Sequence, residues 1–386
     1  MNTKSLILPV ILCLFGSLLG FSQAPALSDK AKISLLTCGS GEELHSVFGH
    51  TAIRIQDNDL QLDEVFNYGT FDFDTSFFYL KFMYGNLEYF LSSSSYQDFI
   101  YHYQISNRSV YEQELQIKKI EKQKIFNQLY KEINSSEKNY TYKFIHNNCT
   151  TKVVDLLSNN IEQNNIQASY SNIDELSYRG IINGYLENKY FEKLGINILF
   201  GYQTDQLCSE IFLPTDLMRS TATAKKNGAD LSSKTDTIYS KSSEEEGFSW
   251  WNNVFVMLLF FAFVILFKKQ KLDLIFINLI AYIGIFMLVF SLISQHEEVN
   301  WNTNILIFNP LLFALAHAFK KNKEKNYKAI TWILLASAII FFFIKINTSG
   351  FYIIIPFIVP IAWIVYRLPY YIIKKEKEEI FENPLG

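Results

Sequence analysis

At 386 residues the chain is long enough for two or three domains, so no single architecture has to account for all of it. The net charge is −3 and the basic residues are spread out except near the C-terminus, which argues against a phosphate-tracking surface and a nucleic-acid partner. The 34 Phe and 23 Tyr are many for a soluble protein and come partly from hydrophobic spans.

The first 24 residues have the pattern of an export signal. Lys4 supplies the positive n-region, Ile7 to Leu19 form the apolar h-region, and small residues up to Ala24 offer a cleavage site. An uncleaved membrane anchor is the competing interpretation. The apolar run is short for a span and polar sequence follows at once, so we expect residues 1–24 to be removed.

Cleavage would remove Cys13 and leave Cys38, Cys149 and Cys208. An odd number in an oxidising compartment allows either three free thiols or one disulfide plus one working thiol. Cys38–Cys208 is the candidate disulfide, although connectivity cannot be deduced from sequence.

Two segments of the exported region, residues 25–219, predict adjacent strands. His50 follows Gly49 and precedes an alternating run, so we expect a tight backbone entry and a strand that begins at His50. Residues 64–70 form the next plausible antiparallel strand. This pairing would bring the Asn67 amide oxygen near His50, where it would accept from the imidazole and fix the ring tautomer.

A third segment surrounds Cys149. Asn148 is a good N-cap, and the apolar spacing of the residues that follow fits a helix. Cys149 would then be the first helical residue, where free N–H groups and the helix dipole favour a thiolate. We therefore predict Cys149 as nucleophile, His50 as base and Asn67 as the residue that orients it.

Each of these residues also has a purely structural explanation. A lone Cys is usually a small buried hydrophobe, His50 could be a strand-end histidine, and Asn67 could be a turn residue. His45 is the main rival for the base because it lies close in sequence. His102 and His146 are expected at solvent-facing or supporting positions.

A cluster of aromatic residues follows the second predicted strand. It consists of Phe71, Phe73, Phe77, Phe78, Tyr79, Phe82 and Tyr84. These side chains could line an acyl groove or dip into lipid headgroups, and the alternative is that they pack the domain core. The candidate substrate-binding residues are Phe71, Phe73, Phe78, Tyr68 and Arg54.

The remainder of the chain changes character. Residues 220–247 are rich in Ser, Thr, Lys and Glu and have the composition of a linker. After them, five membrane spans are predicted at about 248–267, 274–293, 301–319, 329–344 and 351–366, within a transmembrane domain 248–373 and before a cytoplasmic tail 374–386. Prolines interrupt two of the spans, which bundle helices tolerate.

The Lys and Arg residues orient these spans. Five spans that start from an external catalytic domain leave three cytoplasmic segments, which hold the basic groups Lys268–Lys271, Lys320–Lys328 and Arg367–Lys377. The external loop Gln295–Thr303 has no Lys or Arg, and Lys345 lies beside the other external loop. The positive-inside rule therefore predicts that the catalytic domain is periplasmic.

Several motifs resemble the Lnb-type bacterial lipoprotein N-acyltransferases. They are Leu-Leu-Thr-Cys-Gly-Ser-Gly-Glu-Glu (35–43), Phe-Gly-His-Thr-Ala-Ile-Arg (48–54), Phe-Asn-Tyr-Gly-Thr-Phe-Asp-Phe (66–73) and Asn-Asn-Cys-Thr-Thr (147–151). The resemblance continues through Arg179, Gly201, Asp205 and Phe212-Leu-Pro214, and more loosely through Asn300-Trp-Asn302 and Asn309-Pro310. His296 lies in the same external loop as Asn300–Asn302, and these residues could contact lipid headgroups or the periplasmic domain. One departure is Ser40, where the resemblance leads us to expect Pro.

The resemblance implies an α+β fold: a circularly permuted papain-like periplasmic domain, related to NlpC and lecithin–retinol acyltransferase proteins, before an all-α five-helix transmembrane bundle. It implies an enzyme of the bacterial inner membrane that moves an acyl chain from a phospholipid to the α-amine of a diacylglyceryl-cysteine lipoprotein, through a Cys149 thioester. No cofactor is implied, and no ligand set has zinc spacing.

Membrane substrates would explain the anchor, because tethering raises their effective concentration. Three alternatives remain open. An NlpC-like cell-wall amidopeptidase would need a polar groove, a phospholipase or thioesterase would let water replace the amine, and a non-catalytic membrane scaffold would tolerate loss of Cys149.

Overall fold

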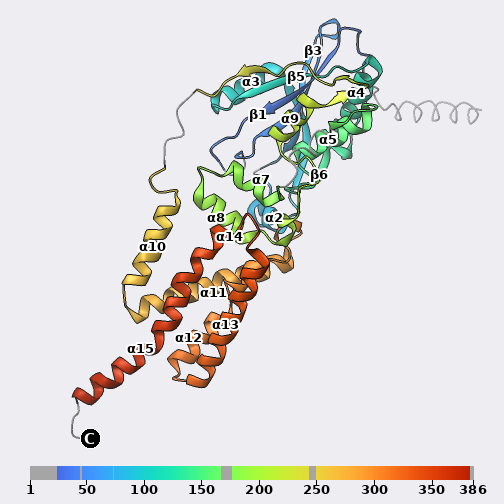
Figure 1. The fold of residues 1–386 in the computed structure, drawn as a ribbon. Coiled ribbons are helices and arrows are strands. Elements are labelled where there is room, and N and C mark those ends of the chain that lie inside the picture. The colour runs from blue at the N-terminus through green and yellow to red at the C-terminus, as the bar shows by residue number, and fades with distance from the viewer. Residues whose placement is uncertain (1–23, 44–45, 73, 167–175, 243–248, 383–386) are drawn as a thin grey trace, which may run out of the picture.

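The computed structural model describes residues 24–43, 46–72, 74–166, 176–242 and 249–382 (Figure 1). The predicted export signal therefore lies outside the described residues except for Ala24, and so do His45 and Phe73. The fold is mixed α/β, with an N-terminal sheet domain followed by apolar helices (Figure 1).

The sheet domain is built on a seven-stranded sheet with the order β6-β4-β3-β2-β1-β5-β9. Each of its neighbouring pairs is antiparallel. The strands are β1 (Lys32–Cys38), β2 (His50–Asp57), β3 (Leu62–Thr70), β4 (Glu88–Ser95), β5 (Val110–Glu114), β6 (Asn139–Thr141) and β9 (Asp236–Tyr239).

Helices cover the two faces of this sheet. The alternation in β2 sends Ile53 and Ile55 into the main core, which lies under α4 (Lys119–Ile133), α5 (Cys149–Asn160) and α9 (Pro214–Thr223). Ala52, on the opposite face of the strand, faces a smaller apolar cluster under α3 (Tyr96–Ile105). A period of two in the side chains thus places one face of the strand in each core.

The segment 220–247, which we expected to be a linker, contains helix and strand within its described residues, 220–242. It contains the end of α9, the two-stranded ribbon of β7 (Lys225–Lys226) and β8 (Ala229–Asp230), and strand β9, which pairs with β5 at the sheet edge. An edge strand needs only one backbone partner and few apolar side chains, so its polar composition misled the prediction.

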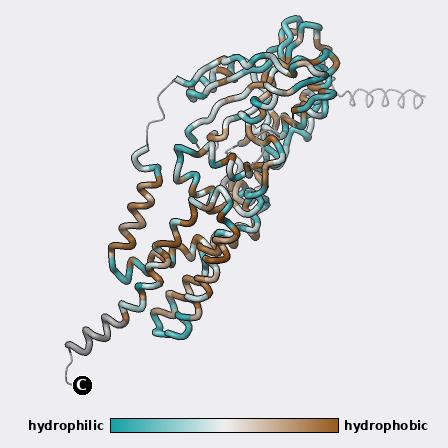
Figure 2. Tube along the Cα trace, viewed as in Figure 1, coloured by the Kyte–Doolittle hydropathy of each residue, from teal (hydrophilic) through white to brown (hydrophobic). Residues whose placement is uncertain are grey.

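The apolar helices follow residue 249. They are α10 (Val254–Leu266), α11 (Gln270–Ile293), α12 (Leu311–Lys320), α13 (Glu324–Lys345), α14 (Phe351–Ile354) and α15 (Ile358–Glu382), with short 3₁₀ turns at Glu297–Val299 (η6), Thr303–Leu306 (η7) and Ile355–Phe357 (η8). Figure 2 shows that apolar residues concentrate in these helices.

Four helical segments are long and apolar enough to cross a membrane: Gln270–Ile293, Glu297–Lys320, Glu324–Lys345 and Phe351–Ile372. The first predicted span, 248–267, corresponds to α10, which has 13 residues. At 1.5 Å per residue this helix is about 20 Å long, shorter than the roughly 30 Å of a hydrocarbon core. The predicted count of five spans is therefore not confirmed.

Three further helical elements lie between the sheet domain and the bundle: α7 (Tyr178–Tyr185), α8 (Tyr190–Leu199) and η5 (Tyr202–Asp205). Ile181 of α7 belongs to the sheet-domain core, whereas Leu194 of α8 belongs to the core of the apolar helices. The two halves therefore pack against one another through this helical layer.

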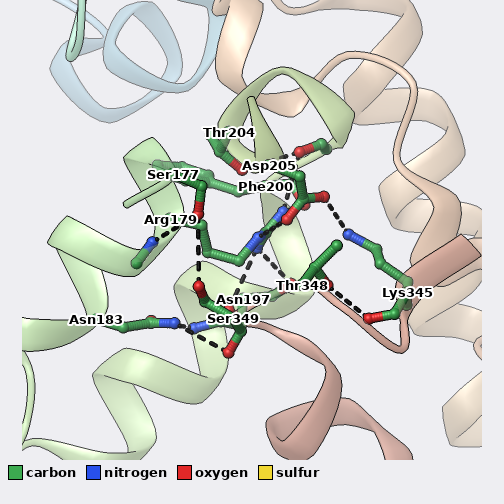
Figure 3. A network of polar contacts seen from close by, with 12 residues as sticks. Ser177, Arg179, Asn183, Asn197, Phe200, Thr204, Asp205, Lys345, Thr348 and Ser349 are labelled. Atoms are coloured by element: carbon green, nitrogen blue, oxygen red, sulfur yellow. Dashed lines mark hydrogen bonds and ion pairs between the residues drawn. The ribbon is translucent and has the colours of Figure 1, made fainter. Parts of the chain in front are cut away.

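A buried polar network joins the same layer to the end of α13 (Figure 3). Arg179 donates from Nε to Asp205 Oδ1 at 2.6 Å, and Lys345 forms an ion pair with the other Asp205 oxygen. The three side chains are 1%, 4% and 3% exposed. Arg179 Nη2 also donates to the carbonyl of Gly201 at 2.9 Å, so three residues of the quoted resemblance meet at this junction.

A second buried ion pair joins α10, α11 and α15. Arg367, counted above as a basic cytoplasmic residue, is buried and forms an ion pair with Asp273 of α11. Its Nη1 also donates to the Ile265 carbonyl at 2.6 Å, which satisfies the C-terminal end of α10.

Candidate active site

His50 begins β2, as the alternation predicted, and the residue before it determines how the chain enters the strand. Gly49 has φ +82°, and a Cβ there would lie 2.6 Å from the Cys38 carbonyl oxygen. Only glycine accommodates both the left-handed backbone and this close approach. His50 is paired with Cys38 across β1 and β2, which places the imidazole at the end of the central strands.

Asn67 lies on the neighbouring strand β3, as the antiparallel pairing predicted. His50 Nε2 and Asn67 Oδ1 are in hydrogen-bonding contact. This contact leaves Nδ1 as the ring nitrogen available to a second partner. The strand register shifts between Asn67 and Thr70, a β-bulge that contains Gly69 with φ +98°. A bulge at this place turns the end of the strand toward the nucleophile.

Cys149 is the first residue of α5, and Asn148 is its N-cap, as predicted. Asn148 Oδ1 accepts from the backbone N–H groups of Thr150 at 2.8 Å and Thr151 at 3.0 Å. Its Nδ2 donates to the Phe144 carbonyl at 2.7 Å, so the cap also holds the preceding loop. Both sides of the amide are therefore used to fix the start of the helix.

Three elements meet at Gly69. A Cβ on this residue would lie 3.4 Å from Cys149 Cβ and 3.4 Å from His50 Cε1. The Thr51 and Thr150 hydroxyl oxygens are 3.3 Å apart and connect β2 to α5 behind the site. The backbone of Gly69 thus lies directly against the histidine and the cysteine, and a larger residue would push them apart.

The electrostatics of the site favour a thiolate paired with an imidazolium. Burial raises the pKa of the Cys149 thiol, but the His50 charge, its hydrogen bond and the Thr51 N–H outweigh burial, so the net pKa is below the ordinary value. Burial lowers the pKa of His50, but Cys149 and Asn67 outweigh it, so the net pKa is raised. Each group stabilises the charged form of the other.

Three tyrosines, Tyr89, Tyr140 and Tyr142, are close enough to Cys149 for its charge to raise their pKa values. Tyr89 stacks on Tyr142 with ring centroids 4.4 Å apart, lies 6.3 Å from the Tyr140 ring, and contacts the half-buried Phe71 at 5.1 Å. Phe71 in turn contacts Phe78 at 5.7 Å. We refer to Phe78, Phe71, Tyr89, Tyr140 and Tyr142 as the aromatic series.

Tyr140 carries a buried hydroxyl whose oxygen lies near the Gly69 N–H and which makes no full hydrogen bond within the described residues, so its own proton is left without an acceptor there. Burial, followed by the Cys149 charge, raises its pKa, so the phenol stays protonated. A Cβ on Gly69 would lie 3.9 Å from this oxygen. A buried unpaired hydroxyl costs stability and is a natural donor for a bound ligand.

Two predicted substrate-binding residues have partners within the sheet domain. Arg54 forms ion pairs with Asp63 and Glu112 and lies 3.4 Å from the centroid of Tyr96, on the α3 side of the sheet. Tyr68 is 2% exposed and donates to Glu132 of α4 at 2.5 Å. Arg54 thus lies on the face of the sheet opposite Cys149, and its prediction as a substrate-binding residue is wrong, because alternation along a strand does not reveal which face holds the site. Tyr68 lies on the same face as α5, with its ring 6.4 Å from that of Tyr140, and its role in substrate binding stays a prediction.

The other cysteines and histidines are also accounted for. Cys38 forms no disulfide within the described residues, so the candidate Cys38–Cys208 disulfide is absent from them. Burial raises the pKa of Cys38 to about 12. His146 pairs with Glu210, and His102 is exposed on α3.

A loop of the membrane half supports the segment before Cys149, a contact that the sequence did not indicate. Glu298 is 2% exposed, and its Oε1 accepts from the Ile145 N–H at 2.9 Å. Lys143 donates to the Gln295 carbonyl at 2.7 Å. These hydrogen bonds join residues about 150 positions apart in the chain. In the sequence, the resemblance of Asn300-Trp-Asn302 in the same loop was the feature that drew attention to this part of the membrane half.

Residues 23–183 match the family model for the Lnb N-terminal periplasmic domain. The match covers the segments that hold His50, Asn67 and Cys149. No match to the chain was found among curated proteins or among solved structures.

Proposed function

Because residues 23–183 match the Lnb N-terminal periplasmic domain, we propose that the chain is an Lnb-type lipoprotein N-acyltransferase with Cys149 as nucleophile. It is a membrane protein with a periplasmic domain, and we place it in the bacterial inner membrane. The observation that carries the proposal is the contact of Cys149, at a helix start, with an imidazole that Asn67 orients.

The proposed fold of the sheet domain is a permuted papain-like one. The order of His on a strand, a polar orienting residue on the next strand and Cys at the start of a helix supports it. In this arrangement the helix N-terminus and the histidine act on the same sulfur.

In the first half-reaction the Cys149 thiolate attacks the ester carbonyl carbon of a phospholipid. A carbon–sulfur bond forms and the carbonyl oxygen becomes an oxyanion. We assign its stabilisation to the Cys149 backbone N–H, which has no preceding helical turn, and to the Tyr140 hydroxyl. The carbon–oxygen bond then breaks, and imidazolium His50 gives its proton to the departing lysophospholipid.

In the second half-reaction the α-amine of a diacylglyceryl-cysteine lipoprotein attacks the Cys149 thioester. Neutral His50 accepts the proton that the amine loses, and the carbon–sulfur bond breaks to restore the thiolate. The products are an N-acylated lipoprotein and the free enzyme. Every proton and acyl group is accounted for by the two substrates and His50, without a cofactor.

The surroundings of the sulfur favour an acyl donor over a peptide stem. Phe71, Tyr89 and Tyr142 are packed around the site, and Tyr89 and Tyr142 are buried or half-buried rings that offer apolar contact. We propose that Phe71 and Phe78 contact the acyl chain. An amidopeptidase site would instead need polar groups to bind a peptide.

The test is mass spectrometry of the N-terminal peptide of a lipoprotein. Cells that lack the gene are complemented with wild type or with Cys149→Ala, and Cys208→Ala serves as a matched thiol control. We expect wild type and Cys208→Ala to restore the amide-linked acyl chain and Cys149→Ala to fail. Restoration by Cys149→Ala would overturn the nucleophile. No change with any variant would overturn the substrate assignment.

A further inference from the structure

The helix α2 (Phe78–Tyr84), with Phe77 before it, presents an apolar face to the outside of the molecule. Its exposed large side chains are Phe77 (75%), Leu80 (63%), Phe82 (42%), Met83 (37%) and Tyr84 (41%). A group of exposed apolar side chains of this kind on a short helix is typical of a surface that contacts a membrane or another macromolecule.

The position of α2 is fixed by the residues that follow α11. Ser294 Oγ donates to the Met83 carbonyl at 2.9 Å, and the Gln295 N–H donates to the Tyr84 carbonyl at 2.6 Å. His296 Nε2 contacts the Phe82 carbonyl at 2.8 Å. The last turn of α2 is thus held to the end of a helix that is long enough to span the membrane.

The apolar face of α2 is close to lipid-facing surface. Leu292 and Ile293, the last residues of α11, are 75% and 55% exposed. Figure 1 places α2 between the sheet domain and the bundle, at the level where the apolar helices begin. Since the sheet domain is periplasmic, this level is the outer surface of the membrane.

Charge on the helix fits the same location. Lys81 is the charged residue in the sequence of α2, and a lysine at the edge of an apolar face can reach phosphate groups while its neighbours enter the acyl region. A soluble protein partner would not need the apolar face to be close to the end of a span.

Phe78, at the start of α2, is connected to the surroundings of Cys149 by a series of ring contacts. Phe78 contacts Phe71, which follows β3, and Phe71 contacts Tyr89 in the aromatic series beside Cys149. The same short segment therefore contacts both the membrane level and the site.

We propose that α2 is an interfacial helix that inserts Phe77, Leu80, Phe82, Met83 and Tyr84 into the outer leaflet, so that a phospholipid acyl chain reaches Cys149 along the aromatic series. The insertion is independent of the reaction, whereas the route of the acyl chain rests on the proposed function.

The first test is photo-crosslinking of the full chain in vesicles of phosphatidylethanolamine and phosphatidylglycerol. The photoreactive residue p-benzoylphenylalanine replaces Leu80, or Tyr101 of α3 as control, in a Cys149→Ala background. Leu80 and Tyr101 are both 63% exposed, so a difference in adduct yield between them reflects where they lie in the molecule and not how exposed they are. We expect phospholipid adducts at position 80 and not at position 101.

Equal lipid adducts at both positions, or none at position 80, would overturn the proposal. Crosslinks from position 80 to a second copy of the chain would do the same, because they would assign the face to an oligomer. Since Cys149 is absent, this result does not depend on whether the chain is an acyltransferase.

The second test links the helix to turnover. Leu80→Asp would lower lipoprotein N-acylation in vesicles by about tenfold or more, because a charge replaces an exposed apolar side chain that the proposal places in the lipid. Tyr101→Asp, at the control position, would leave it unchanged. Equal rates for the two variants would overturn the acyl-chain route. Absence of N-acylation by wild type would contradict the proposed function and leave the crosslinking result intact.

Discussion

His50 and Asn67 come from adjacent antiparallel strands, and the imidazole Nε2 meets the Asn67 amide oxygen while the same ring hydrogen-bonds Cys149. The amide therefore decides which ring nitrogen faces the sulfur. The orientation of the base therefore depends on the register of strands β2 and β3.

Asn67→Ala would leave the imidazole free to rotate and change tautomer. A hydrogen bond to a charged group contributes about 1.5–3 kcal/mol, so we expect the rate of N-acylation to fall by about one to two orders of magnitude. Asn67→Gln keeps the amide and would recover part of the rate if the strand tolerates the longer chain. Wild-type rates for Asn67→Ala would show that the contact is structural only.

The pH dependence of Cys149 alkylation follows from the two pKa shifts. The pKa of Cys149 is lowered and that of His50 is raised, because each group stabilises the charged form of the other. Iodoacetamide would therefore react with Cys149 at pH values well below the ordinary thiol pKa of about 8.5.

His50→Asn would move this alkylation profile to higher pH, because the cation that lowers the thiol pKa is gone. Buried Cys38, with its pKa raised to about 12, is the internal control and would stay unlabelled in the folded protein. Peptide mass spectrometry separates the sites. A profile for Cys149 that His50→Asn does not change would contradict the pairing.

Tyr140→Phe removes the unpaired hydroxyl and keeps the ring. Loss of one oxyanion donor typically costs about 10²–10³ in kcat, and we expect a fall of that order in acyl transfer with little change in Tm. Tyr68→Phe is the matched control: its hydroxyl binds Glu132 away from the site, so stability would fall by about 1 kcal/mol while the rate is kept. If Tyr68→Phe lost the rate and Tyr140→Phe kept it, the assignment of Tyr140 as the oxyanion donor would be wrong.

Glu298→Ala would leave the Ile145 N–H without its acceptor and loosen the segment that leads to Cys149. We expect slower alkylation of Cys149 and a lower Tm, since an unpaired buried donor costs about 1–3 kcal/mol. Glu298→Gln keeps an acceptor oxygen and should restore most of the alkylation rate. Glu297→Ala, with a 65% exposed side chain, is the control and should behave as wild type.

The buried network of Arg179, Asp205 and Lys345 (Figure 3) should matter far more for stability than an exposed ion pair. Arg179→Met removes one partner of a buried charge, which typically costs about 3–5 kcal/mol. Lys328→Met breaks an ion pair with Glu324 whose side chains are 70% and 78% exposed, so its cost should be near zero. Thermal unfolding in detergent compares them, and equal Tm values would contradict the prediction.

Local pattern in the sequence determined a large part of this protein. The alternation after Gly49 predicted that a strand begins at His50, and Asn148 predicted the helix that begins at Cys149. The uncharged apolar runs predicted membrane helices. These features depend on neighbouring residues alone: the side-chain period, capping and hydrophobic length act within a few turns of chain.

The tertiary structure decided what depends on distant partners. Arg54 lies on a strand as predicted, but on the face that meets α3 instead of the face that holds the site. The polar segment 236–239 became an edge strand because β5 offers backbone hydrogen bonds, which composition does not record. Glu298 reached Ile145 because the loop after α11 folds back onto the sheet domain. Such contacts join residues far apart in the chain, and their free energy comes from burial and pairing that exist only once both halves are folded.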